Sequence, residues 1–296
     1  MSSSTRKSSG AMLQASRTRP RVPWRGLPGR VGPAVVWTGG LIMLIPFVWM
    51  VLSSFKPLLE IMSPAVQLLP QSPSLDNYTK LFANYAFPQY ILNSLIVTSC
   101  ICFSITTTSV LLGFVFAKAK FRGRNFIFLV VLATMALPFE IIAVPLLLEF
   151  QAFHGLDSLP TLVVPFMVDA FPVFLCRQFM ATIPNDYLDA ARVDGANDLE
   201  VLWRIVVPMS GPAIAAVAIL SFLYNWDQLF WPLVSIASDA NRTVPLGIVA
   251  LSTQFGPDYD LTMAASTLTI LPVVVVFLLL RRHFISGMAL SGLAGR

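Results

Sequence analysis

Six stretches of this chain are long, apolar and almost free of charge. A helix needs about 20 such residues to cross the hydrocarbon core of a bilayer, and in lipid its backbone N–H and C=O groups must pair within the segment. The alternating polar and apolar pattern of a membrane barrel strand is absent. The chain is therefore predicted to be all-α, a polytopic membrane protein with six transmembrane helices. The predicted spans cover residues 34–54, 90–117, 125–148, 158–176, 212–231 and 261–280.

Composition and charge support this class and give an orientation. Hydrophobic residues make up 56% of the chain and charged residues 12%, whereas about a quarter of the residues in a soluble protein are charged. If both termini are cytoplasmic, 17 of the 20 lysines and arginines fall on cytoplasmic segments, and only Lys56, Lys80 and Arg242 fall outside. Basic loops stay inside, so this topology is predicted. It also explains the net charge of +5, so nucleic-acid binding is not indicated.

The chain is predicted to consist of a tail and one membrane domain. Residues 1–33 are rich in Ser, Arg, Pro and Gly without an apolar period, which predicts a disordered basic cytoplasmic tail. Residues 34–296 form the transmembrane domain, whose first span is favoured as an uncleaved helix because no small-residue cleavage site follows it. The loops 55–89 and 232–260 are placed outside, and both are long enough to contact an external partner.

The chain offers little material for catalysis or cofactor binding. Its two histidines lie on opposite sides of the membrane in this topology, and its three cysteines lie within spans, so no His-pair metal site or His-dependent triad is expected. The phosphate-binding sequence G-x-x-x-x-G-K-[S/T] does not occur. No catalytic, cofactor-binding or metal residue is predicted, and the chain is expected not to be an enzyme. If ATP powers transport, another chain binds it.

The longest strongly charged segment of the second half, residues 189–208, lies between two apolar spans, and a pair of short helices is predicted over residues 185–207. Asn185 is a predicted N-cap that starts a short helix. Asp194 and Gly195 then supply a turn in which glycine can adopt positive φ. Three small side chains near this turn would allow another surface to approach closely: Ala190, Ala191 and Ala196.

A second short helix is predicted after the turn. Asn197 and Glu200 have the spacing of a capping box, and Pro208 is expected to end this helix because it lacks an N–H. The segment is thus a helix, a glycine turn and a helix on the cytoplasmic face. On these residues alone, an ordinary structured loop and a docking element are equally favoured.

This segment resembles the cytoplasmic motif of permeases of ATP-binding-cassette (ABC) importers, written E-A-A, three residues, G, nine residues, I-x-L-P. Asp189 stands where Glu is usual and Val207 where Leu is usual. The resemblance implies a pair of coupling helices that sits in a cleft of the ATPase subunit. The residues it assigns to coupling are Asp189, Ala190, Ala191, Asp194, Gly195, Ala196, Ile205 and Pro208.

Other sequences resemble the carbohydrate branch of these permeases, in the same order along the chain after about residue 34. They are SFKP at 54–57, NS at 93–94, LPFE at 137–140, WDQLFWPL at 226–233, TVPLG at 243–247 and the tail 282–296. The resemblance implies the type I ABC importer permease fold, in the cytoplasmic (inner) membrane of a prokaryote. The chain would form half of a channel for a sugar or sugar-like solute.

The same resemblance implies the partners. A second homologous permease would complete the channel as a heterodimer. Two copies of an ABC ATPase would bind ATP and Mg, and an extracytoplasmic solute-binding protein would deliver the solute. The chain itself would bind no cofactor, and its spans would contact membrane lipid.

Five residues are candidates for the solute path or for contacts between subunits. Asp169 lies in the fourth span between Pro165 and Pro172; an ionisable group in a span usually faces a cavity or partner, with a packing hydrogen bond as an equal alternative. Glu140 follows Pro138, and stabilisation of a helix break is the alternative to a path role. The resemblance adds Asn93, Trp226 and Asp227.

Other functions stay open at this point. The solute would instead belong to another class, such as a polyamine or an amino acid, if the binding protein retains such a ligand. A proton-coupled secondary transporter would use Asp169 or Glu140 and would work in a pH gradient without ATPase subunits. A membrane enzyme is disfavoured because no nucleophile, base and metal ligands converge.

Overall fold

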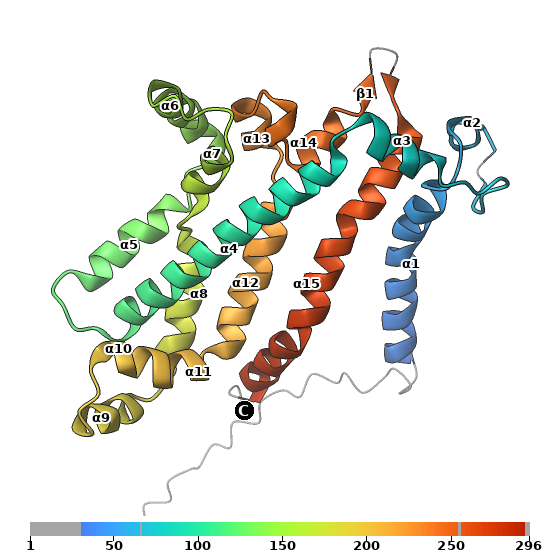
Figure 1. Cartoon of the computed structure of the whole chain (residues 1–296). Helices are drawn as coiled ribbons and strands as arrows, with labels where there is room; N and C mark the ends of the chain where they lie inside the picture. The colour runs from blue at the N-terminus through green and yellow to red at the C-terminus, as the bar shows by residue number, and fades with distance from the viewer. Residues whose placement is uncertain (1–30, 66, 254–255, 294–296) are drawn as a thin grey trace, which may run out of the picture. The chain divides into compact units, whose positions relative to one another are not determined.

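The computed structural model describes residues 31–65, 67–253 and 256–293 (Figure 1). Helices dominate these residues, which confirms the predicted fold class, and the two-residue strands β1 (Ser252–Thr253) and β2 (Gly256–Pro257) pair antiparallel. The helices are α1 (Val31–Ser53), α2 (Leu58–Ile61), α3 (Asp76–Asn84), α4 (Phe87–Lys118), α5 (Arg124–Thr134), α6 (Phe139–Ala152), α7 (Leu159–Val163), η1 (Val164–Phe166), α8 (Ala170–Ala181), α9 (Asn185–Val193), α10 (Asp198–Val201), η2 (Leu202–Val206), α11 (Val207–Met209), α12 (Gly211–Trp226), α13 (Phe230–Ser235), η3 (Asp239–Asn241), α14 (Val244–Val249) and α15 (Tyr259–Leu293).

The described part of the chain divides into two units between Phe47 and Val48. Helix α1 begins at Val31, three residues before the predicted first span, and continues for 23 residues with Pro46 inside it. The rest of the predicted disordered tail, residues 1–30, lies outside the described residues. The sites described below all belong to the second unit.

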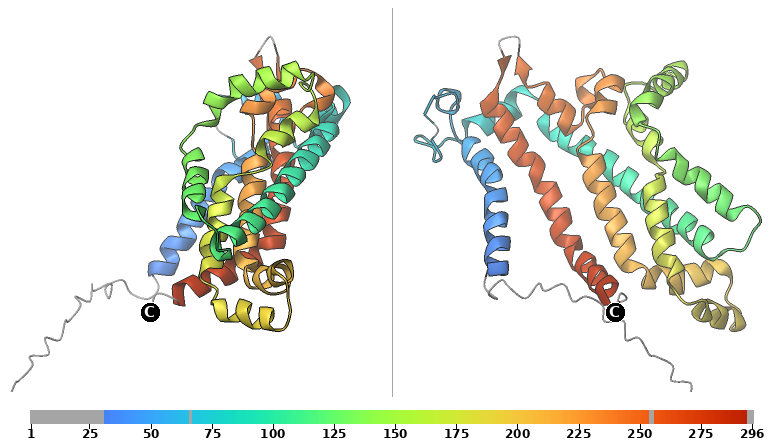
Figure 2. Two further views of the ribbon diagram at one scale, coloured as in Figure 1. Left: turned by 90° about the vertical axis from the view of Figure 1, so that its left-hand side faces the viewer. Right: turned by 180° about the vertical axis from the view of Figure 1, so that it is seen from behind.

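Helix α4 is the centre of the second unit. It packs against α8 and α12, and α12 packs against α15, and Figure 2 shows these helices side by side from two further directions. Apolar side chains of α4, α8 and α12 form one buried cluster. Its members include Ile101 on α4, Cys176 on α8 and Val217 on α12. Gly113 lets α4 and α8 approach closely, because a Cβ added there would lie 2.6 Å from the Cβ of Cys176. A small residue at such a contact is typical of membrane helix packing.

Three predicted spans are unbroken helices, within α1, α4 and α15, and three candidate spans are bent pairs. The prediction of one helix over 125–148 is wrong, because α5 and α6 meet at 90°. Pro138 causes this break, since it has no N–H and disfavours helical backbone at the residue before it. The prediction over 158–176 is also wrong as a single helix: α7 with η1 meets α8 at 43°. Helix α12 ends at Trp226, so the last residues of the fifth predicted span lie in a turn and in α13.

Contacts between distant segments show which loops lie at the same end of the second unit. At one end of α4, the Tyr90 hydroxyl donates to Asp239 Oδ1 at 2.5 Å, and Ser94 Oγ accepts from the N–H of Val244 at 2.8 Å. At the other end, Lys118 Nζ donates to the carbonyl of Ile183 at 2.5 Å. Leu81 of the first loop predicted outside is buried in one cluster with Val244 and Leu251 of the second, so these two loops meet. Lys118 places the α4–α5 loop beside α9 at the opposite end of α4. The assignment of that end to the cytoplasm stays a prediction from the basic residues.

Candidate coupling segment and solute path

The charged segment between α8 and α12 folds as predicted, into a helix, a glycine turn and a helix. Helix α9 ends at Val193 with Asp194 as its C-cap, and Gly195 follows at φ 88°, a left-handed conformation that glycine adopts without strain. The N–H of Gly195 bonds to the carbonyl of Arg192, and the N–H of Ala196 to that of Ala191, the pair of bonds that defines a Schellman motif. The predicted capping box is confirmed: Asn197 Oδ1 accepts from the N–H of Glu200, and Glu200 Oε2 from the N–H of Asn197, both at 3.0 Å.

Two local predictions about this segment are wrong. Pro184, and not Asn185, occupies the N-cap position of α9. The Asn185 side chain instead accepts a hydrogen bond from Lys118 Nζ at 3.0 Å, which ties the segment to the end of α4. Pro208 does not end the second helix, which runs on to Met209 through the π-helical turn η2. Pro208 lies two residues after this π-helical turn and has no N–H to contribute to the helix, which ends one residue later.

The segment has a buried face and an exposed face. Leu188, Val201, Leu202 and Val206 are buried in the same cluster as residues of α4 and α8. The opposite face carries four large side chains that are at least 49% exposed: Tyr187, Val193, Leu199 and Trp203. Exposed apolar groups gathered on one element are typical of an interaction surface.

The residues of the motif are distributed over both faces. Ala191 and Ala196 are half-buried and pack against the core, so their small size allows α9 and the turn to lie close to it. Ala190, Asp194 and Pro208 are exposed and Ile205 is half-buried. The Asp189 side chain is 67% exposed, and it is therefore available at the surface.

Ion pairs hold the exposed face together. Arg192 bridges the two helices, with 3.2 Å to Asp189 and 2.9 Å to Asp198. Asp198, and to a lesser extent Asp189, raise the pKa of the Arg192 guanidinium. A third pair joins Arg204 to Glu200 one helical turn away, at 3.5 Å. Such exposed pairs are worth about 0–1 kcal/mol each, so the buried face and the caps dominate the stability of the segment.

A second candidate site lies where α8 begins and α12 ends. A cavity of about 300 Å³ is lined there by Asp169 and Phe171 from the start of α8 and by Ser221, Tyr224 and Asn225 from the end of α12. A neighbouring cavity of about 400 Å³ shares four of these residues, all but Ser221, and extends to the break between α5 and α6. We call these two cavities the groove.

Asp169 is the charged group of this groove. It is the N-cap of α8, and its Oδ1 accepts from the N–H of Phe171 at 3.0 Å. Met167 lies in the break between η1 and α8. Its carbonyl accepts a hydrogen bond from Ser104 Oγ on α4 at 2.8 Å. Among the described residues that line the groove, none is a lysine, arginine or histidine. Arg177 stays away from Asp169, because its guanidinium lies over the ring of Phe128 and Nε donates to the carbonyl of Phe116.

The structure does not bring the other four candidates into the groove. Asn93 is buried and donates to the carbonyls of Ala240 and Arg242. Trp226 is buried, and its Nε1 donates to the carbonyl of Thr269 on α15. Asp227 lines a different cavity with residues of α15, and Glu140 is exposed in the first turn of α6. The contacts of Asn93 and Trp226 thus account for them as packing residues of this chain.

Sequence reasoning missed Tyr224, Asn225 and Asp157. Tyr224 and Asn225 lie just before the WDQ sequence, and only the folded arrangement places them opposite Asp169. Asp157 has φ 55°, and its Oδ1 accepts from the N–H groups of Ala237 and Ser238 and from the Ser238 hydroxyl. These bonds, the backbone N–H of Ser238 first, lower the pKa of Asp157. It fixes the loop after α6 to the loop after α13, and no sequence pattern signals this role.

Comparison with known proteins now bears on the function. Residues 109–289 match the family described as binding-protein-dependent transport system inner membrane component. The arabinooligosaccharides transport system permease protein AraQ of Bacillus subtilis is 34% identical over 86% of this chain and 92% of its own length. The sn-glycerol-3-phosphate transport system permease protein UgpE of Yersinia pestis is 37% identical over 68% of this chain and 73% of its own length.

A solved structure has the same fold. It is a bacterial ABC transporter involved in the import of the acidic polysaccharide alginate, and one of its chains matches with a TM-score of 0.72 at 24% identity, over 86% of this chain and 96% of that one. The structural match and the family match over residues 109–289 both point to the membrane subunit of a transporter. The chain belongs to the family of binding-protein-dependent transport system inner membrane components.

Proposed function

We propose that this chain is one of two homologous membrane subunits of an ABC importer for a sugar or sugar-like solute without net negative charge. Hydrolysis of ATP, with Mg, belongs to two copies of a separate ATPase that docks on the segment from Asp189 to Pro208. An extracytoplasmic binding protein delivers the solute, and the complex lies in the inner membrane. The observation that carries the proposal is the placement of an exposed coupling segment at one end of α12 and of the groove at its other end.

Helix α12 connects the two sites mechanically. The coupling segment passes into α12 at Ser210 with a bend of 79°. Its buried face packs in the core with α4 and α8, so we expect movement of the segment to move these helices. A force that an ATPase exerts on Tyr187, Val193 and their neighbours therefore reaches Tyr224 and Asn225 through a rigid helix. Movement of α12 against α8 would change the width of the groove, as alternating access requires.

The groove supports an uncharged, hydroxyl-rich solute. Discontinuous helices place polar backbone and side-chain groups at substrate sites in other transporters. Hydroxyl groups of a solute could donate to the Asp169 carboxylate, and they could donate to or accept from Asn225 and Tyr224. Phe171 offers an apolar face. A carboxylate with no neighbouring cation repels anions, and this repulsion is strong where solvent is scarce. AraQ is named for arabinooligosaccharides, which agrees with an uncharged solute. UgpE is named for an anionic phosphate ester, which does not.

The same carboxylate favours a second candidate, a cationic polyamine. The names of the matched relatives favour sugars over it. Retention of labelled ligands by the binding protein that assembles with this importer separates the two. We expect retention of a neutral oligosaccharide, and retention of spermidine alone would replace the sugar with the polyamine.

Cysteine accessibility tests the path. In a chain without Cys100, Cys102 and Cys176, Tyr224→Cys places a thiol in the groove of the assembled importer. We expect cationic methanethiosulfonate to modify it faster than the anionic reagent, after correction for their rates with a free thiol, and Asp169→Asn to reduce this ratio severalfold. No modification in any nucleotide state would refute the path. Equal corrected rates, unchanged by Asp169→Asn, would refute the charge preference alone.

A further inference from the structure

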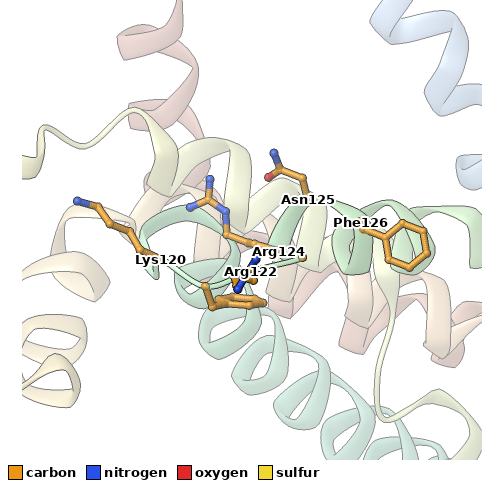
Figure 3. Close-up of a pocket in the computed structure, with 7 residues that line it drawn as sticks. Lys120, Arg122, Arg124, Asn125 and Phe126 are labelled. Atoms are coloured by element: carbon orange, nitrogen blue, oxygen red, sulfur yellow. The ribbon is translucent and has the colours of Figure 1, made fainter.

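The loop between α4 and α5 forms a basic hollow at the end of the molecule that carries the coupling segment. A cavity of about 570 Å³ is lined by seven consecutive residues, from Lys120 to Phe126. Figure 3 shows Lys120, Arg122 and Arg124 around it, with Asn125 and Phe126 where α5 begins. Lys118 fixes the loop beside α9 through its bonds to Ile183 and Asn185.

Two of the cations in this loop lack a partner in the described part of the chain. Arg124 Nη1 donates a hydrogen bond to the carbonyl of Ala119 within the loop, at 2.9 Å. Lys120 and Arg122 are exposed, and the described residues form no ion pair or side-chain hydrogen bond with them. The sequence contains no Asp or Glu between Asp76 and Glu140. The hollow therefore carries two cations that no carboxylate of the described residues pairs with.

The surroundings of the hollow are apolar. Phe121 is 41% exposed and Phe126 is 70% exposed. Helix α5 continues from the hollow with three more large apolar side chains that are at least 46% exposed: Ile127, Leu129 and Val130. A soluble anion would need only the cations, whereas a lipid needs cations beside an apolar surface. The combination fits the boundary between headgroups and acyl chains.

We propose that this loop binds the headgroup of an anionic phospholipid. Lys120 and Arg122 contact the phosphate, Arg122 through its planar fork of donors, while Phe121 and Phe126 lie against the upper part of the acyl chains. The preference for basic residues in inner loops explains why cations occur here. It explains neither the hollow nor the aromatic side chains on both sides of Arg122. Because Lys118 bonds to the start of α9, the bound lipid would also steady the coupling segment.

Native mass spectrometry of the purified importer tests this site. The complex is titrated with phosphatidylglycerol, with phosphatidylcholine and with inorganic phosphate, and the bound molecules are counted. We expect preferential binding of phosphatidylglycerol, reduced about fivefold per cation removed and so about 25-fold in the double variant Lys120→Gln/Arg122→Gln. Arg122→Lys keeps the charge but loses the planar fork of donors, so it is expected to reduce binding less than Arg122→Gln does. Lys80→Gln, an exposed cation on α3 at the other end, is the control without effect.

Each contrary result is decisive. Equal binding of the two lipids by the unmodified importer would overturn the proposal, as would an unchanged preference in the double variant. Displacement of phosphatidylglycerol by equimolar inorganic phosphate would show a site for soluble anions instead. Assembly of the double variant with its partner subunits, seen in the same spectra, shows that loss of lipid does not result from misfolding.

Discussion

The coupling segment and the groove are built in different ways. Neighbours in the sequence make the segment: Gly195 closes α9, and Asn197 and Glu200 cap α10. The groove is made by residues about 55 positions apart, Asp169 and Tyr224, which meet because broken helices pack on α4. The first is a rigid element that can transmit force, and the second is a joint between helices that can change shape. This difference suits a protein that receives work at one end and moves a solute at the other.

The largest effect is expected from a substitution that disrupts the packing of α4 against α8, which lies between the coupling segment and the groove. Gly113→Val would place side-chain atoms where the Cβ of Cys176 lies 2.6 Å away, so α8 must shift from α4. We expect a loss of about 1–3 kcal/mol and loss of transport. The measurement is thermal stability of the purified complex together with solute uptake. Gly211→Ala, where an added Cβ meets nothing within 4 Å, should leave both nearly unchanged.

The next effect concerns the coupling segment alone. Gly195 has φ 88° with open space around it, so Gly195→Val costs only the backbone strain, about 1–2 kcal/mol. We expect local opening of α9, seen as faster amide hydrogen exchange there, and weaker coupling of ATP hydrolysis to uptake. Gly195→Asn is the matched control, since Asn tolerates this conformation. Equal damage by Asn and Val would show that the side chain, and not φ, matters.

A third change weakens the other half of the segment. Asn197→Ala removes the cap of α10 and should cost about 1 kcal/mol, with faster amide exchange in residues 198–201 and unchanged exchange in α8. Asn197→Asp retains an acceptor for the N–H of Glu200 and is expected to preserve the protection. Exchange that rises throughout α12 and α8 instead would contradict the local character of this element.

The smallest effect tests the outer loops that hold the groove's helices in place. Asp157→Ala removes three hydrogen bonds to the loop after α13, and we expect a loss of about 1 kcal/mol at neutral pH. The folded pKa of Asp157 lies below its ordinary value of 3.8. The stabilisation is thus complete above that value and is lost as the pH falls through the lower, folded pKa. The stability difference between Asp157→Ala and the unmodified chain should therefore be larger at pH 7 than under acid.

The same contrast explains what could be predicted from the sequence. The glycine turn and the capping box depend on residues at most three positions apart, and both predictions are confirmed. The N-cap at Asn185 failed because Lys118, 67 positions earlier, bonds its side chain. Asp169 was identified as a candidate because a charge in a span needs a partner or a cavity. Its companions Tyr224 and Asn225 could not be identified, because they meet it only after the 43° break turns α8.

The central claim is that force from an ATPase enters through the exposed face of the coupling segment, and one crosslink tests it. Val193 is 88% exposed on this face, so Val193→Cys, in a chain without the native cysteines, can carry a benzophenone label in a transport-active importer. The account predicts a photo-adduct with the ATPase, and none from Leu75→Cys, a 63% exposed position in the loop before α3. An active importer in which label at position 193 never reaches the ATPase would contradict it.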